Sequence, residues 1–204
     1  MSLCPFTIGA DYNCADPIQP GLFNYVYLIN KSDISSYTIT SGILTNITLK
    51  PGKVAYKFEG IRGSFDARYE QVNSGLFSTG YRHIIEMSIY DISSDGKVNI
   101  EKLALNDMVG ITFLSNSPGN DNTYFEVYGL GVGLETVQLT RINTDLEYMG
   151  AFRATLQTSE TLIEGLLPLT YFNTDYATSK AELDSLLQVG TNTVFPFTFP
   201  FNLA

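Results

Sequence analysis

The sequence predicts a mainly β fold with one or two short helices. Short segments of apolar, or alternating apolar and polar, residues recur along the middle of the chain, separated by Gly, Asn and Ser turn residues. Hydrophobic residues make up 44% of the 204 residues, which is enough for a packed core. We expect an N-terminal arm over residues 1–21, a single β-rich domain over 22–190 and an extended C-terminal tail over 191–204.

Seven segments have the pattern of strands. Residues 22–29 are apolar on both faces, which is typical of a strand covered on both sides. Residues 53–59 alternate between two faces, and so do residues 81–91, where His83 and Ile85 share the apolar face. The other predicted strands are 109–115, 123–128, 136–142 and 151–157.

Two short helices are predicted between and after these strands. The first covers residues 100–106, with Asn99 as its cap. The second covers residues 180–188, and Ser179 and Glu182 before and within it have the spacing of a capping box.

Three segments are predicted to be irregular. Residues 60–80 mix glycine, serine, charged and aromatic residues and predict a long loop. Residues 116–122 predict a surface turn, and residues 129–135 predict a bulged, glycine-rich connection. The glycines of 129–135 lack the spacing of a dinucleotide fingerprint, so this segment does not predict a nucleotide site.

Both ends of the chain carry residues suited to contacts between subunits. In the tail, phenylalanines alternate with prolines and small residues, so this segment should lie extended across its own domain or a neighbouring subunit. The candidate assembly contacts, from the two ends and from residues 60–80, are Cys4, Phe6, Phe65, Tyr69, Phe77, Phe195, Phe197, Phe199 and Phe201.

The charge composition points to an assembly rather than to a nucleic-acid binder. Charged residues make up only 16% of the chain, which indicates that much of its surface is covered, most simply by copies of itself. The net charge of −9, with 12 Lys and Arg, argues against a tight grip on duplex DNA but is compatible with DNA sliding past. Arg62, Arg68 and Arg82 lie near aromatic residues, but neighbouring acidic residues neutralise them.

No catalytic, cofactor-binding or metal-binding constellation is recognisable. His83 is the only histidine, lies on an apolar strand face and has no Gly-x-Ser-x-Gly motif to accompany it, so we interpret it as a packed or interface residue. Cys4 and Cys14 do not combine with it into a metal-ligand spacing and are expected to be reduced thiols of a cytosolic product. We therefore expect no enzymatic activity, cofactor or metal, and we expect no membrane partner, because no apolar run reaches the ~20 residues of a span.

The order of these features resembles that of a known family. The residues are Cys4, Asp11, Cys14 and Gly21, the Val26-Tyr27-Leu28 strand, the strand YRHIIEMSIYDIS, the helix NIEKLALND, the strand MVGITFLS, the segment YFEVYGLGVGLE and a Thr-Leu-Gln-Thr-Ser-Glu step at 155–160. Over about residues 4–170 this order resembles the tail-tube-type structural proteins of tailed phages that infect Bacteroidetes-like hosts. The chain departs from the pattern at Pro20-Gly21, in residues 60–80 and in the Phe-Pro tail.

The resemblance implies a tail-tube-like β-sandwich or half-open barrel that closes, in six copies, into a ring around a lumen. Stacked rings would form a conduit through which DNA passes as non-specific cargo, and an acidic lumen would let it pass without binding. It further implies a virion location after assembly in the host cytoplasm, with copies of itself and other tail or connector proteins as partners.

Two other functions remain open at this point. The first is a head-tail connector, a tail terminator or another ring or decoration protein of the same particle. The second is a carbohydrate- or surface-binding β-sandwich, for which the 13 tyrosines would supply stacking platforms.

Overall fold

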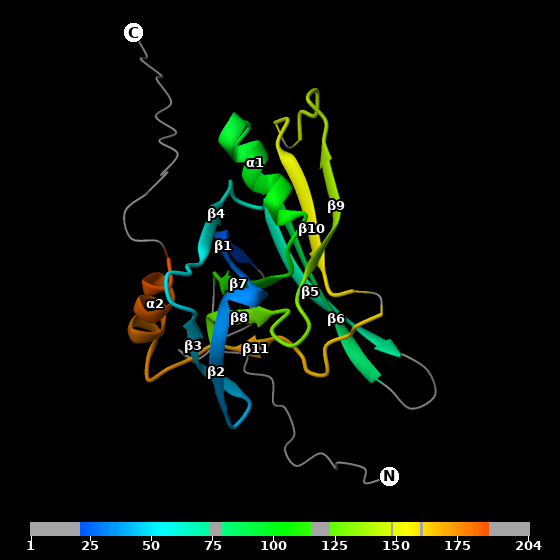
Figure 1. Cartoon of the computed structure of the whole chain (residues 1–204). Coiled ribbons are helices and arrows are strands. Elements are labelled where there is room, and N and C mark those ends of the chain that lie inside the picture. The colour runs from blue at the N-terminus through cyan, green and yellow to red at the C-terminus, as the bar shows by residue number, and fades with distance from the viewer. Residues whose placement is uncertain (1–20, 74–78, 116–122, 148, 160, 188–204) are drawn as a thin grey trace, which may run out of the picture.

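The computed structural model describes residues 21–73, 79–115, 123–147, 149–159 and 161–187, and its described part is mainly β with two α-helices (Figure 1), which confirms the predicted fold class. In chain order the elements are β1 (Leu22–Asn30), a 3-10 turn (Lys31–Asp33), β2 (Ile34–Thr40), β3 (Ile43–Leu49), β4 (Tyr56–Glu59), β5 (Phe65–Asn73), β6 (Thr79–Ile89), α1 (Ser94–Leu103), β7 (Met108–Leu114), β8 (Phe125–Tyr128), β9 (Glu135–Arg141), β10 (Phe152–Gln157), β11 (Leu169–Thr170) and α2 (Tyr176–Ser185). The predicted turn at 116–122 and nearly all of both predicted arms lie outside the described residues.

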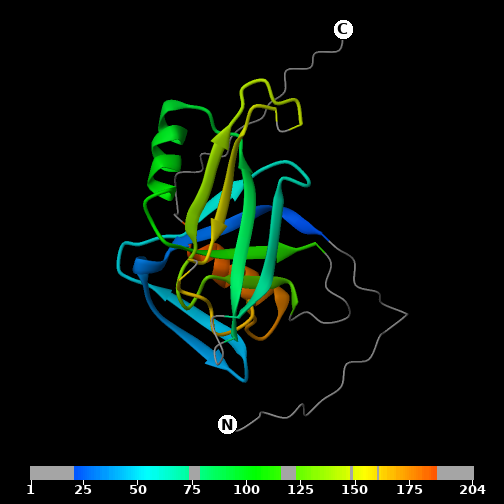
Figure 2. The ribbon, with the colours of Figure 1, turned by 90° about the vertical axis from the view of Figure 1, so that its right-hand side faces the viewer.

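The strands form three antiparallel sheets. One has five strands in the order β11-β8-β7-β1-β4, the second has four in the order β5-β6-β10-β9, and β2 and β3 form a separate hairpin. Figure 2 shows the long strands of the four-stranded sheet side by side, with the hairpin below them. The sheets pack on one another and do not close into a barrel.

The five-stranded sheet is the middle layer, and both of its faces are buried. In β1, Val26 and Leu28 belong to a core shared with the four-stranded sheet and α1. Tyr27 and Ile29 point the other way, into a core shared with α2 and the hairpin. Successive strand residues alternate between faces, so a strand covered on both sides must be apolar throughout, which confirms the prediction for residues 22–29.

The two sheets meet closely because of a glycine. Gly110 of β7 faces Ile85 of β6, and a Cβ at this position would collide with the Cδ1 atom of Ile85. Leu134 and Leu156 fill the same interface and are fully buried.

Helix α2 is attached to the other face by packing and by two tyrosines. Leu183 is fully buried in that core. The Tyr27 hydroxyl donates to Asp184 Oδ1 at 2.6 Å, and the Tyr171 hydroxyl donates to Glu182 Oε2 at 2.7 Å. Burial raises the pKa of Tyr27, so its hydroxyl keeps the proton that it donates.

The predicted long loop at 60–80 is wrong, because most of it is strand. Residues Phe65–Asn73 form β5, which pairs with β6 along its whole length. The alternation was hidden because β5 is an edge strand whose outward face is charged and whose inward face includes the small Ala67 as well as Phe65 and Tyr69.

Both helices begin earlier than predicted. Ser93 caps α1 by accepting a hydrogen bond from the Gly96 N–H, so Asn99 lies inside the helix and is not its cap. Asp175 caps α2 by accepting from the Thr178 N–H, whereas Ser179 is buried within the helix. In each case a competent cap stands several residues before the one predicted.

Besides β5, three strands were not predicted, and the strands predicted at 53–59 and 123–128 are shorter than expected. β2 and β3 are rich in Thr and Ser and have an irregular register, while β11 has only two residues. The strand predicted at 53–59 begins at Tyr56. The segment 129–135 is a connection as predicted, and it joins β8 in one sheet to β9 in the other.

Replacing Leu156 by Ala should lower the free energy of unfolding by about 2–5 kcal/mol, because it leaves a cavity between the two large sheets. Leu162→Ala is the matched control, since Leu162 is 60% exposed, and it should change stability by less than about 0.5 kcal/mol. Urea unfolding measures both, and equal effects would contradict the packing described here.

Candidate functional site

His83 is a packed residue. It is 2% exposed, its Nδ1 accepts from the Gly129 N–H at 3.1 Å, and its Nε2 lies 3.0 Å from the Leu166 carbonyl oxygen. Because Nδ1 accepts, Nε2 carries the proton and donates to Leu166. Burial lowers the pKa of His83, although Glu164 and the Leu166 carbonyl oppose this shift. Within the described ranges there is no group of three or more His, Cys, Asp and Glu side chains that could hold a metal ion.

The glycine-rich connection has its backbone donors occupied. The N–H groups of Gly131 and Val132 donate to the Glu164 carboxylate, with N–O distances of 2.9 Å to Oε1 in each case. On the other side, Lys31 Nζ donates to the carbonyl oxygens of Leu130 and Gly131. A phosphate would need the backbone N–H donors that already bind Glu164. The contacts of Glu164 and Lys31 therefore hold this connection in place, and the connection offers no nucleotide site.

The four-stranded sheet is the candidate functional site, because two long strand edges are left free. β5 pairs only with β6, and β9 pairs only with β10, among the described residues. The two edges run over Phe65–Asn73 and Glu135–Arg141. A free edge presents unpaired backbone N–H and C=O groups and is a template for another strand.

The directions of the two free edges match. Each strand of the sheet is antiparallel to its neighbour, so β5 and β10 run one way and β6 and β9 run the other. When two copies are placed side by side in the same orientation, β9 of one therefore lies antiparallel to β5 of the next. An even number of alternating strands is what permits this continuation.

The outward face of this sheet is mostly polar, although Ile84 and Ser88 on the central strand β6 are buried. The residues of this face pair with one another in register across the sheet, and they lie on the side away from the core. They are Asp66, Arg68, Glu70, Val72, Gly80, Arg82, Ile84, Glu86, Ser88, Glu135, Gln138, Thr140, Arg153, Thr155 and Gln157.

The charges on this face are nearly balanced and pair with one another. Arg68 lies 2.8 Å from Asp66, 2.6 Å from Glu86 and 3.9 Å from Glu70, and Arg82 lies 4.0 Å from Glu70. The hydrogen bond to Glu86 raises the pKa of Arg68 above its usual range. This confirms the predicted neutralisation of Arg68. Arg82 only approaches Glu70, and among the described residues Arg62 forms no ion pair.

Two of the predicted assembly contacts lie in this sheet. Phe65 of β5 is half-buried and packs against the core under the sheet. Tyr69 is 50% exposed and meets the Tyr81 ring edge-on, with 6.3 Å between ring centroids. The other predicted contacts, Cys4, Phe6, Phe77, Phe195, Phe197, Phe199 and Phe201, lie outside the described residues.

The sequence analysis did not single out the β9 edge, which carries exposed apolar side chains. Val137 is 48% exposed and Leu139 is 36% exposed. The sequence predicts only a strand over 136–142, and the absence of a neighbouring strand among the described residues shows that Val137 and Leu139 border a free edge.

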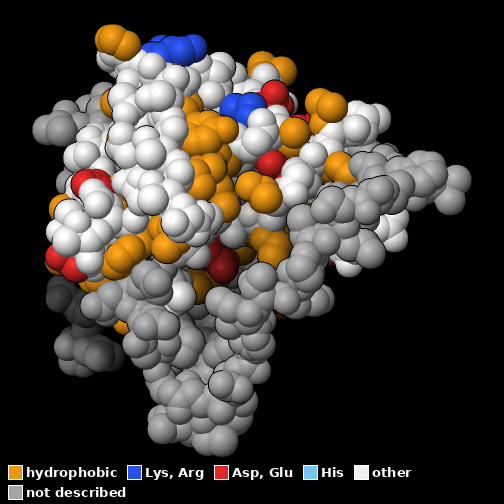
Figure 3. All heavy atoms as spheres, turned by 90° about the horizontal axis from the view of Figure 1, so that it is seen from below, with side chains coloured by type: hydrophobic (Ala, Val, Ile, Leu, Met, Phe, Trp, Pro, Cys, Tyr) orange, Lys and Arg blue, Asp and Glu red, His pale blue; other side chains and the backbone are white. Residues whose placement is uncertain are grey.

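A second apolar area lies at one end of the sheet. The segment between β10 and β11 crosses the lower part of the domain in Figure 1 and exposes Leu162, Leu166 and Leu167. Figure 3, which views the molecule from below, shows hydrophobic side chains gathered on this face and few charged ones. An exposed apolar area of this kind marks an interaction surface.

Comparison with protein-family models, with curated proteins and with solved structures found no match for this chain. Among the described residues, no helix is both long enough and apolar enough to cross a membrane.

The free energy of unfolding should fall as the pH is lowered from about 7.5 to 5.5. The pKa of His83 is lowered in the folded protein, so the unfolded chain takes up a proton first, near its ordinary pKa of about 6.5. The slope should reach at most about 1.4 kcal/mol per pH unit. Urea unfolding of the parent and of His83→Asn across this window tests the assignment, and an unchanged slope in the variant would contradict it.

Proposed function

We propose that this protein is a structural protein of a phage virion, a tail-tube or related ring subunit that forms a conduit for DNA. The observation that carries the proposal is the four-stranded sheet whose two free edges have matching directions. It supports the ring geometry that the family resemblance implies, and the resemblance supplies the expected number of six copies.

Joining β9 of one copy to β5 of the next extends the sheet from subunit to subunit. Such a contact is heterologous, because it uses two different surfaces, and a heterologous contact repeats until it closes into a ring or continues as a helix. Closure removes both free edges and so removes the aggregation risk that they carry. The exposed Val137 and Leu139 at the β9 edge would be covered in the same contact.

The polar face of the extended sheet is suited to line a lumen. The opposite face is occupied by the core that β6 and β10 share with the five-stranded sheet, so the polar face is the one left for solvent or cargo. Carboxylates engage Arg68, and Arg82 lies 4.0 Å from Glu70. The face therefore offers few free cations to neutralise DNA phosphates, and few counterions would be released from the DNA. DNA could then move along it without being held.

Ring formation should be abolished by the double substitution Val137→Lys and Leu139→Lys. Lysines on an edge strand oppose the addition of another strand. Both positions are exposed enough for the monomer to fold. Negative-stain electron microscopy and sedimentation would report rings or tubes for the parent and folded monomers for the variant.

The matched control is Val98→Lys with Leu105→Lys. These positions are 47% and 83% exposed and lie on and just after α1, outside both edge strands, so rings should form as in the parent. A parent that stays monomeric at high concentration, or edge-variant rings like those of the parent, would overturn the proposal. Single rings that never stack would instead identify a connector or terminator.

Deletion of residues 1–20 should impair assembly more than folding. The described residues of both cores lie between Tyr25 and Leu187, so we expect the urea midpoint to shift little. Particle counts by electron microscopy should drop, and identical particles from the truncated chain would show that the arm is not an assembly contact.

A further inference from the structure

We infer that the free edge of β2 is a docking site for the Phe-Pro segment, residues 195–201, of a second copy of the chain. The segment would add to β2 as one more strand. This inference requires that two copies meet, but it does not require the ring proposed above, because β2 belongs to neither of the large sheets.

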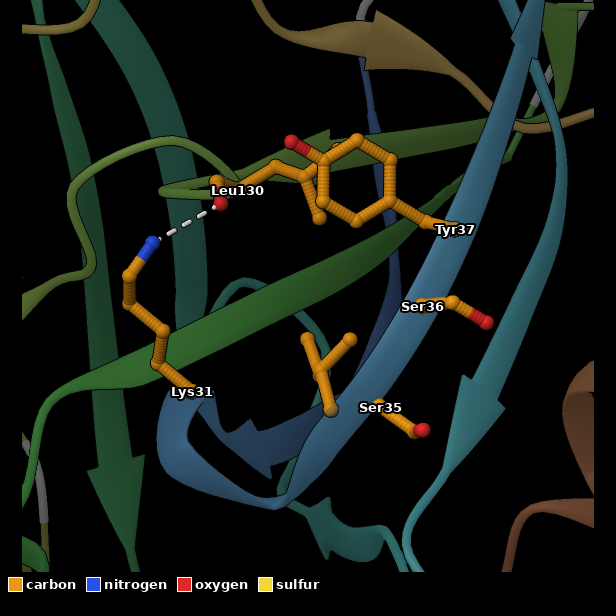
Figure 4. Close-up of a pocket in the computed structure, with 6 residues that line it drawn as sticks. Lys31, Ser35, Ser36, Tyr37 and Leu130 are labelled. Atoms are coloured by element: carbon orange, nitrogen blue, oxygen red, sulfur yellow. Dashed lines mark hydrogen bonds between the residues drawn. The ribbon is translucent and has the colours of Figure 1, made fainter.

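A groove runs along this edge. It has a volume of about 410 Å³ and is lined by Lys31, Ile34, Ser35, Ser36, Tyr37 and Leu130 (Figure 4). Four of these residues, 34–37, are consecutive in β2, and Leu130 forms the opposite wall. The Lys31 amine lies at this groove and donates to the Leu130 and Gly131 carbonyl oxygens, which hold it in place without removing its charge.

The backbone of β2 is available on the groove side. Within the described part of the chain, β2 pairs with β3 alone. Tyr37 is 46% exposed and Ile39 is 41% exposed, although large apolar side chains on a strand are normally covered. A strand edge beside a partly apolar groove is the arrangement used when an extended peptide is added to a sheet.

The Phe-Pro segment has the pattern of a strand with only one bonding edge. In a strand, alternate residues direct their N–H and C=O groups to opposite sides. Pro196 and Pro200 have no N–H, and both fall on the same side. Phe195, Phe197, Phe199 and Phe201 direct their backbone groups to the other side and place all four rings on one face. Residues 188–204 also contain no charged side chain, so Lys31 of the groove would meet no side-chain cation in this segment.

The position of α2 favours a neighbouring copy as the source. Leu187, just after α2, forms a bridge with Ala55, and Leu183 packs with Leu44 and Ile47 of β3. Figure 1 shows α2 on the β3 side of the hairpin, so the chain leaves α2 on the side opposite the groove. The 17 residues of 188–204 can extend up to ~56 Å, which is enough to reach an adjacent subunit.

Peptide binding tests the groove and the bonding side. The probe is a fluorescent peptide of residues 193–204, and the receptor is the full chain with serine in place of the four tail phenylalanines. Methylation of the Phe197 backbone nitrogen should weaken binding by about tenfold through the loss of one hydrogen bond, and methylation at Thr198 should change it by less than about twofold. No binding, or equal losses at the two nitrogens, would overturn the inference.

Receptor variants locate the site. Tyr37→Lys in the groove should weaken peptide binding, while Tyr56→Lys on the β4 edge should not, and the two tyrosines are equally exposed, at 46% and 45%. Loss of binding with Tyr56→Lys alone, or capture of a peptide of residues 1–20 in place of the tail peptide, would overturn the assignment.

Crosslinking identifies the source of the segment. In chains whose Cys4 and Cys14 are replaced by Ser, one population carries Ser36→Cys and another carries Thr198→Cys. A thiol crosslinker should join one chain of each kind into a dimer. Crosslinks that form only within a single chain carrying both substitutions would overturn docking in a second copy.

Discussion

The whole architecture depends on a middle sheet that must be covered on both faces. β1 places Val26 and Leu28 on one side and Tyr27 and Ile29 on the other, and all four side chains are buried. A strand of this composition is unstable unless another layer packs on each face. The four-stranded sheet with α1 meets one requirement, and α2 with the β2–β3 hairpin meets the other. Burial of the tyrosines then fixes the polar part of the structure, because Tyr27 and Tyr171 need the carboxylates of α2 as hydrogen-bond partners.

Covering the faces of a sheet does not cover its edges, and the two proposals rest on this difference. β5, β9 and β2 each have one side without a paired strand in the described part of the chain. The unpaired backbone groups of such an edge are a template for another strand. In the four-stranded sheet the edges match each other, whereas β2 matches the single bonding side of the Phe-Pro segment. The two contacts use different strands, so they can be broken separately.

The segments whose structure followed from the sequence are those in which burial fixes the residue pattern. The strands at 22–29, 81–91 and 109–115 were found because their apolar residues leave no other choice. β5 was missed because its outward residues Asp66, Arg68 and Glu70 are charged. These residues pair with one another and with Glu86 and Arg82 on the next strand, and the sequence does not show that β5 and β6 are neighbours. The hairpin was missed because Ser and Thr occupy its exposed positions and its register is irregular.

By itself, the sequence determined the class of fold, the strands β1, β7 and β8 of the middle sheet, the buried state of His83 and the neutralised Arg68. These are consequences of local alternation and of neighbouring charges. Tertiary structure alone decided which strands lie at edges, which way those edges run, and that Glu164 binds the backbone donors of the glycine-rich connection. The physical reason is that an edge is defined by the absence of a neighbour, and Glu164 lies more than thirty residues from its partners. Only the folded chain brings such distant residues together.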